Sequence, residues 1–254
     1  ISMAGLVSGD STGFSRGISP LLLILWLVNN IVFIIVILSV IGFDRKPFES
    51  IAVHGMVLDI EKNKMSKSLG NTISPKDVIS KYGRDYLRYY FAKLSRGEDF
   101  AYDEKEFKEI ANVFRVLINV NNFVNQLKKE NQLKKEKIED KWIISRFNST
   151  IKEATRSFNE YKFYEAVYKL ERFLIEDLSK TYIQIIRDRA EEVSSLLEEI
   201  RNKLLILYSS VIPFSTEKIW QNLRGEKIVK EESIHLSNWP AVDESKINLD
   251  LEED

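Results

Sequence analysis

The sequence predicts a mainly α-helical fold in which a small α/β part precedes a long helical part. No proline occurs between Glu104 and Pro213, and that stretch is rich in Lys, Glu, Leu, Ile and Asn. Apolar residues within it recur at spacings of three and four, as on one face of a helix. They include Tyr164, Val167, Leu170, Leu174 and Leu178. Upstream, Ser50 to Leu58 is short, apolar and β-branched enough to form a buried strand.

Start and stop signals place the elements that follow this strand. Asp59 to Asn71 is polar and is predicted to be a loop. Ser74-Pro75 starts a helix, with serine as the N-cap and proline at the first helical position, and Gly83 ends it. We expect a second helix over Arg84 to Leu94 and a short extended segment over Glu98 to Asp103.

The remaining chain is predicted to form an antiparallel helix bundle and a tail. Lys128 to Lys141 is a charged stretch typical of a solvated helix end and linker, and Gly225 to Ile234 is a loop before a final extended segment, His235 to Pro240. The predicted domains are residues 1–43 (atypical apolar segment), 44–104 (α/β and connecting part), 105–225 (helix bundle) and 226–254 (tail).

Composition excludes several kinds of site. The 254 residues contain 37 Lys and Arg against 38 Asp and Glu, whereas a non-specific nucleic-acid binder is normally basic. A local basic patch on a surface of balanced charge can still bind nucleic acid. The absence of cysteine excludes disulfides and cysteine-ligated zinc and fits a reducing cytosol. With only His54 and His235, no metal site, and in particular no zinc site, is expected.

The first 43 residues differ from the rest. Leu21 to Phe43 is almost wholly apolar, and about 20 apolar residues suffice to cross a bilayer. Only Arg16 is basic before this run and no small-residue cleavage site follows it, which disfavours a signal peptide. Three interpretations stay open: a frame-shifted, damaged or incomplete gene, a buried helix without its covering domain, and a membrane anchor. We do not expect a membrane partner, and we expect a cytoplasmic protein.

The string Lys64-Met65-Ser66-Lys67-Ser68 carries the strongest chemical signal. It places two ammonium groups and two hydroxyls on a polar loop after a strand, where they can surround a triphosphate. When pyrophosphate leaves, negative charge grows on the leaving group, and cations that meet it there stabilise the transition state. A basic turn of this size is by itself more often only a solvated surface feature.

The sequence around this loop resembles a known family. The string His54 to Pro75, HGMVLDIEKNKMSKSLGNTISP, resembles the signature loop of class I aminoacyl-tRNA synthetases. Lys141 to Ser149 (KWIISRFNS) resembles the start of the anticodon-binding domain of the isoleucyl and valyl enzymes, and Glu176 to Arg189 (EDLSKTYIQIIRDR) resembles the isoleucyl version in particular. The segment from Pro213 to Leu223 and the closing Ser233 to Pro240 (SIHLSNWP) also match, so the resemblance covers about Ile37 to Leu251.

The resemblance implies the end of a Rossmann-like nucleotide-binding domain followed by an anticodon-binding helical bundle. It implies ATP-dependent ligation of isoleucine to tRNA, with Mg²⁺; valine is the second choice of amino acid and leucine the third. Lys64 and Lys67 are the implied ATP-contacting lysines, Lys67 being the more important. The implied ATP site comprises His54, Gly55, Val57, Lys64, Met65, Ser66, Lys67 and Ser68.

Contacts to tRNA are weighed against packing. Exposed Arg and Lys can hold phosphates, and aromatic rings can stack on unpaired bases. The candidates are Arg146, Lys180, Arg187, Arg189 and Trp220. For Trp220 a core position is favoured over a surface one. For Arg187 and Arg189 the alternative is an ordinary salt bridge to Asp188 or Glu191.

The chain departs from the family in what it lacks. It has no HIGH-type motif, no amino-acid pocket, no editing domain and no C-terminal extension, so we expect it to be unable to form aminoacyl-adenylate alone. A separate N-terminal catalytic half is then a possible partner. A binding-only tRNA module and a non-functional relic are the alternatives of a different class.

Overall fold

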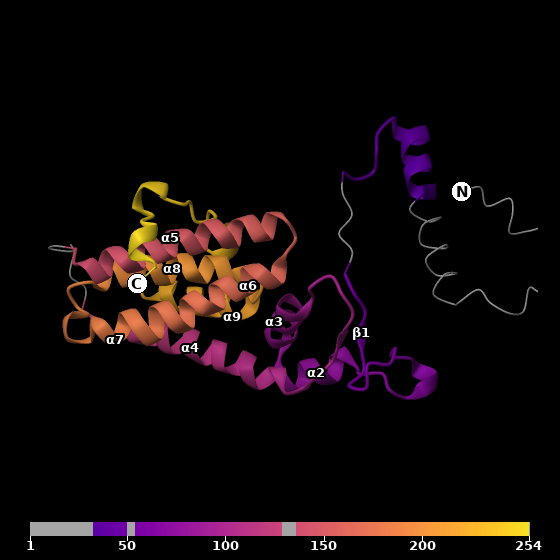
Figure 1. Ribbon diagram of the computed structural model, residues 1–254, viewed down its shortest axis with the longest axis horizontal. Helices are drawn as coiled ribbons and strands as arrows, with labels where there is room; N and C mark the ends of the chain where they lie inside the picture. The colour runs from indigo at the N-terminus through magenta and orange to yellow at the C-terminus, as the bar shows by residue number, and fades with distance from the viewer. Residues whose placement is uncertain (1–32, 50–53, 129–135, 254) are drawn as a thin grey trace, which may run out of the picture. The chain divides into compact units, whose positions relative to one another are not determined.

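A two-stranded parallel sheet anchors the α/β part of the chain. The computed structural model describes residues 33–49, 54–128 and 136–253, which fall into two units, residues 1–52 and 53–254. In the second unit, β1 (Val57–Leu58) pairs with β2 (Phe100–Ala101), so that Val57 lies opposite Phe100 (Figure 1). The described strand is shorter than predicted because its pairing with β2 covers only these two residues; residues 50–53 of the predicted strand lie outside the described residues.

Two short helices lead from the strand to the bundle. α2 (Pro75–Tyr82) and α3 (Arg84–Leu94) have the predicted bounds. Gly83 ends α2 with a φ of 100°, a conformation that glycine adopts without strain, and its N–H donates to Ile79. Ser74 occupies the N-cap position, but its hydroxyl makes no capping hydrogen bond.

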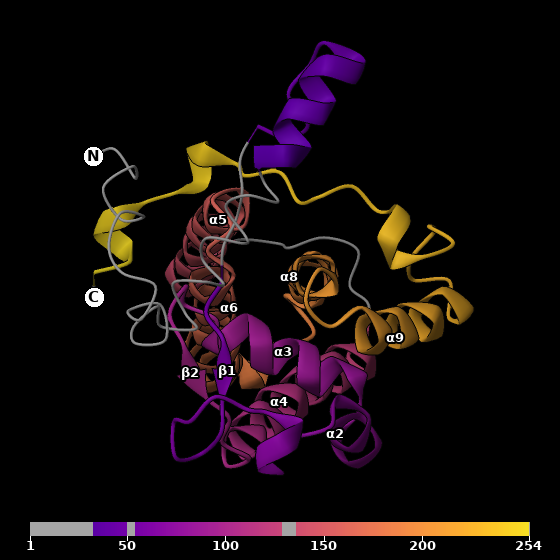
Figure 2. The same ribbon diagram turned by 90° about the vertical axis from the view of Figure 1, so that its right-hand side faces the viewer.

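Most of the described chain from Glu106 to Gly225 is helical, which confirms the prediction of a mainly α fold. Figure 2, turned by 90° from Figure 1, looks nearly along α5 and α8. The helices are α4 (Glu106–Gln126), α5 (Ile138–Asn159), α6 (Phe163–Arg172), α7 (Ile183–Ile185), α8 (Ser194–Ser209) and α9 (Pro213–Gly225). Their buried leucine, isoleucine, valine and aromatic side chains form one core that also includes Tyr89 and Tyr90 of α3.

A ten-residue π-helix, Phe173–Tyr182, joins α6 to α7. The predicted apolar stripe runs through it, and Leu170, Leu174 and Leu178 are buried as expected. Because a π-helix pairs residues five apart, the buried set widens beyond the α-helical stripe to include Asp177 and Tyr182. The sequence pattern did not reveal this change of helix type.

α3 is bonded to the corner between α8 and α9. The buried carboxylate of Asp85 accepts hydrogen bonds from the N–H groups of Phe214 and Ser215 at the start of α9, at 3.4 and 2.5 Å. One turn later, the Arg88 guanidinium donates to the carbonyls of Ser210 and Val211, at 3.3 and 3.0 Å. One helix face therefore satisfies both the free donors and the free acceptors of the α8–α9 corner.

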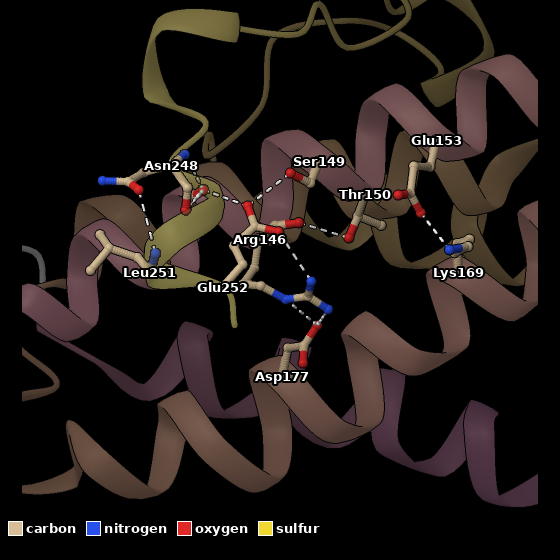
Figure 3. Close-up of polar contacts among 10 residues, drawn as sticks. Arg146, Ser149, Thr150, Glu153, Lys169, Asp177, Asn248, Leu251 and Glu252 are labelled. Atoms are coloured by element: carbon tan, nitrogen blue, oxygen red, sulfur yellow. Dashed lines mark hydrogen bonds and ion pairs between the residues drawn. The ribbon is translucent and has the colours of Figure 1, made fainter. Parts of the chain in front are cut away.

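The C-terminal tail packs along α5 (Figure 3). Arg146 is the centre of this contact: it bonds Asp177 of the π-helix at 2.8 Å and Glu252 of the tail at 3.1 Å. Ser149 donates to the same Glu252, and the Trp239 indole donates to Thr155 of α5. The predicted extended segment His235 to Pro240 is wrong, because Ile234–Leu236 forms a 3₁₀ turn capped by Ser233 and no strand follows in the described tail.

In the first unit, residues 33–43 are helical, and the Ser39 hydroxyl donates to the Arg45 carbonyl at 2.8 Å. Most of the apolar run from Leu21 lies outside the described residues. No helix among the described residues is both long and apolar enough to cross a membrane.

We predict that Asp85→Ala lowers the free energy of unfolding by about 1–2 kcal/mol, because it leaves the first N–H groups of α9 buried without an acceptor. The measurement is urea denaturation followed by circular dichroism, read as a lower midpoint at constant m-value. Asp188→Ala, an exposed aspartate, is the control and should stay within about 0.5 kcal/mol of the parent. Equal midpoints for the two variants would contradict the role assigned to Asp85.

Candidate functional site

The site begins at the entry to β1, where Gly55 passes close to the β2 side of the sheet. A Cβ added to Gly55 would lie 1.9 Å from the Glu98 carbonyl oxygen, so only glycine fits this backbone approach. The next residue, Met56, donates its N–H to the Asp99 carboxylate at 2.7 Å. Gly55 therefore allows the backbone before β1 to lie directly against the backbone of Glu98 and Asp99, just before β2.

Asp59, directly after β1, organises the first half of the loop. Its carboxylate accepts hydrogen bonds from the N–H groups of Glu61 and Asn63, at 3.0 and 2.7 Å, and its own N–H donates to the Asn63 carbonyl. Lys62 takes a φ of 64° at the tip of this turn. The turn brings Lys64 back beside Leu58 as an antiparallel bridge partner.

Asn71 closes the loop from the other side. Its side-chain amide donates to Asp59 at 2.8 Å and to the Lys64 carbonyl at 3.3 Å, while its side-chain oxygen accepts from the Ser66 N–H at 2.9 Å. One amide thus ties the two halves of the loop together. Asp59 and Asn71 lie within the string that resembles the family loop, but the sequence analysis assigned them no role. The polar residue directly after the strand and the Gly-Asn turn were the available signals.

The Lys64–Ser68 string lies on this braced frame. Ser66 caps the 3₁₀ turn Lys67–Leu69 through its hydroxyl, which also lies 2.8 Å from the Ser68 hydroxyl. Gly70 ends the turn with a φ of 70°. The side chains of Lys64 and Lys67 are exposed, and neither has an ion-pair partner among the described residues, so both ammonium groups are available to an anion.

The other residues of the implied ATP site are divided between the core and the surface. Val57 and Met65 are partly buried and pack against the hydrophobic core. His54 is exposed, and its Nδ1 lies 2.8 Å from the neighbouring Gly55 carbonyl. The structure therefore brings Lys64 to Ser68 together on one short loop, with His54 and Gly55 at the entry to the strand that carries it.

Three of the five candidate tRNA contacts are used inside the bundle. Arg146 is taken up by Asp177 and Glu252 (Figure 3). Arg189 bonds Glu139 and Asp140 at the start of α5, at 2.6 and 2.8 Å, rather than its sequence neighbours. Trp220 is only 2% exposed and donates its indole N–H to the Glu231 carbonyl, so it has no free face for a base.

The other two candidates are on the surface. Lys180 is exposed and pairs with Glu176 one turn earlier, a contact that solvent screens strongly. Arg187 is exposed in the 3₁₀ turn after α7. No group of three or more potential metal ligands occurs in the part of the chain that the structure describes.

Hydrogen bonds hold the pKa of the Asp59 carboxyl below its usual 3.8. The largest effect comes from the Asn71 side-chain amide, and the next from the Asn63 backbone N–H. Because the folded pKa is lowered, the hydrogen bonds to Asp59 are fully present above pH 3.8 and are lost only as the pH falls through the folded value.

We predict that Asn71→Ala raises the pKa of Asp59 toward 3.8, measured by NMR titration of the aspartate carboxyl carbons. Asn63→Ala, which keeps the backbone donor, should change it less. An unchanged pKa in Asn71→Ala would refute the bracing.

Two family models match the chain. Residues 24–103 match the class I tRNA synthetases of the I, L, M and V group, and residues 140–254 match the anticodon-binding domain of tRNA ligase. The first match contains the braced loop, and the second contains the helices from α5 onward together with the tail.

Curated relatives and a solved structure agree with these matches. The isoleucine–tRNA ligase of Pyrococcus horikoshii is 36% identical over 236 residues, which are 85% of this chain and 22% of that protein. The Methanosarcina barkeri isoleucine–tRNA ligase is 36% identical over 236 residues, 84% of this chain and 22% of that protein. This chain therefore spans about a fifth of the length of these relatives.

The fold is also that of a solved synthetase, the Agrobacterium radiobacter K84 agnB2 LeuRS in a ternary complex with tRNA and LeuAMS. The TM-score is 0.66 at 20% identity, over 85% of this chain and 27% of that one. Taken with the braced Lys64–Ser68 loop and the two family models, these likenesses show that the chain belongs to the class I aminoacyl-tRNA synthetases.

Proposed function

We propose that this chain supplies the ATP-phosphate loop and the tRNA-binding bundle of an isoleucine–tRNA ligase. The observation that carries the proposal is the pair of exposed ammonium groups of Lys64 and Lys67, which have no ion-pair partner within the described part of the chain. They lie on a loop fixed by Asp59 and Asn71. In this proposal residues 44–104 close the nucleotide-binding domain, residues 105–225 bind tRNA, and residues 226–254 form a tail docked on the bundle.

The chemistry assigned to the loop is electrostatic. When an amino-acid carboxylate attacks the α-phosphate of ATP, pyrophosphate leaves and negative charge grows on its oxygens. Lys67, with Lys64, meets that charge, while the Ser66 and Ser68 hydroxyls and the N–H groups of the 3₁₀ turn can donate to phosphate oxygens. Val57 and Met65 shape the apolar base of the loop, and His54 and Gly55 set its entry.

Magnesium fits this arrangement only together with the nucleotide. Mg²⁺ usually binds through substrate phosphates and a few carboxylates. Since the described residues contain no group of three metal ligands, we assign the ion to the triphosphate and to residues beyond this chain's loop.

Isoleucine is preferred to valine because the curated relatives described above are isoleucine–tRNA ligases at 36% identity. The residues that select the amino acid belong to a catalytic half that carries the HIGH-type motif and the amino-acid pocket. We propose that such a half acts with this chain, in the cytoplasm.

The direct test is isoleucine-dependent ATP–pyrophosphate exchange. The chain alone should show only background exchange. Mixed with the part of the Methanosarcina barkeri isoleucine–tRNA ligase that precedes the matched region, it should support exchange, with co-purification reporting assembly. Exchange that depends on valine instead would change the assigned amino acid, and strong exchange by the chain alone would show that no separate half is needed.

Within that reconstituted enzyme, Lys67→Ala should lower the exchange rate by about 10²–10³-fold, because it removes a cation that meets charge developing in the transition state. Lys64→Ala should act in the same direction. Lys62→Ala removes the same charge from the tip of the same loop and should stay close to the parent. Full activity in the Lys64→Ala/Lys67→Ala double variant would disprove the assignment.

A further inference from the structure

The turn between α5 and α6 carries a cluster of aromatic side chains, which we call the aromatic corner. Its members are Phe158, Tyr161 and Phe163, together with Trp239 of the tail, and neighbouring ring centres lie 5.7–6.4 Å apart. Phe158 packs against the core, whereas Tyr161, Phe163 and Trp239 are 59%, 44% and 40% exposed. Large apolar groups gathered at a protein surface mark a site of interaction.

Tyr161 holds a backbone conformation that costs a tyrosine free energy. It follows Glu160, the C-cap of α5, has a φ of 59°, and donates its N–H to the Phe158 carbonyl at 3.1 Å. The N–H of Lys162 donates to the Ser157 carbonyl at 2.8 Å. This bonding pattern ends many helices, and its left-handed position is usually occupied by glycine. A bulky residue there is uncommon and indicates that the side chain itself is used.

The described chain offers the Tyr161 ring little in return for this strain. The ring lies 6.4 Å from the Phe163 ring, edge-on, and both rings are exposed. The Tyr161 hydroxyl has no hydrogen-bond partner among the residues that the structure describes. The turn therefore holds an aromatic ring at the surface at a cost in free energy.

The aromatic corner lies beside the loop that leads into β2. The guanidinium carbon of Arg96, in that loop, is 5.8 Å from the centre of the Tyr164 ring, and Tyr164 directly follows Phe163. The sheet of β1 and β2 has two strands in the described part of the chain, whereas parallel sheets are usually larger and covered on both faces. The aromatic corner is therefore within reach of a protein part that completes this sheet.

We propose that the aromatic corner is a docking surface for the catalytic half of the synthetase, with the Tyr161 ring as its central contact. The match to the class I synthetase model includes β1, β2 and the loop between α3 and β2, so the family's nucleotide-binding domain is the part that adjoins this sheet. This chain spans 22% of the length of the relatives described above. The inference rests on the proposed function in one respect, that a catalytic half acts with this chain.

The composition of the corner favours a protein over a nucleic acid. Aromatic residues are enriched in protein interfaces, and Tyr and Trp are among the strongest contacts there. A nucleic acid requires a surplus of cations. The charged residues beside the rings provide none, being Arg96, Arg156 and Lys162 against Glu98, Asp99, Glu160 and Glu165.

The test compares glycine substitutions at two helix ends of the same kind. Lys227 follows α9 with a φ of 61°, and the N–H groups of Lys227 and Ile228 donate to the carbonyls of Arg224 and Leu223, both at 2.9 Å. Tyr161→Gly and Lys227→Gly should each keep or raise the urea midpoint of the full chain, because glycine relieves the strain. Only Tyr161→Gly should weaken assembly with the part of the Methanosarcina barkeri enzyme that precedes the matched region. The expected loss in Kd is at least about 5-fold, measured by biolayer interferometry.

A second pair of variants guards against indirect effects. Tyr161→Phe keeps the ring and should assemble like the parent. Phe163→Ala should weaken assembly, whereas Phe214→Ala should not, although it also removes an exposed ring from the start of a helix, α9.

Equal affinities of the parent, Tyr161→Gly and Phe163→Ala for the catalytic half would overturn the inference, as would a parent chain that does not assemble at all. Loss of self-association in these variants would show that the corner joins two copies of this chain, and weaker tRNA binding at unchanged assembly would show that it faces RNA. Either result also overturns the inference. The proposed function is judged separately, by whether the assembled parent supports isoleucine-dependent exchange.

Discussion

The arrangement of the second unit depends on how α3 holds the corner between α8 and α9. Asp85 supplies acceptors to the free N–H groups of α9, and Arg88 supplies donors to the last carbonyls before it. On the side facing α6, Tyr89 and Lys93 both bond Glu171. α3 therefore contacts both α2, the helix that follows the signature loop, and the bundle helices α4, α6 and α9.

The loop itself is ordered by polar side chains rather than by a core. Only Met65 of the Lys64–Ser68 string packs against apolar residues, whereas Asp59 and Asn71 provide the cross-links. All of these bonds are short-range in sequence and lie near solvent. Such a frame can hold a shape and still exchange between conformations, as a loop that admits a triphosphate and releases pyrophosphate requires.

Local signals in the sequence were sufficient for the bounds of the first two helices after the loop. Ser74-Pro75 and Gly83 predicted the ends of α2, and the motif predicted Lys64 and Lys67 as ATP-contacting lysines, which stays a prediction. Long-range partners could not be read in the same way. Arg189 pairs with Glu139 and Asp140, about fifty positions earlier in the sequence. Trp220 is buried by residues packed around it, and its neighbours in the sequence do not indicate this. The π-helix was hidden because spacings of three and four fit either helix type over one or two turns.

The π-helix has a consequence for how this part of the chain can vary. Asp177 and Tyr182, five positions apart, both reach α5, where they meet Arg146 and Asp140. In an ordinary α-helix of 3.6 residues per turn, two such residues would point to different sides. Loss of a single amino acid between them would therefore rotate one contact away from its partner. A substitution at an outward-facing position of the π-helix leaves both contacts with α5 in place. An insertion or a deletion between Asp177 and Tyr182 does not.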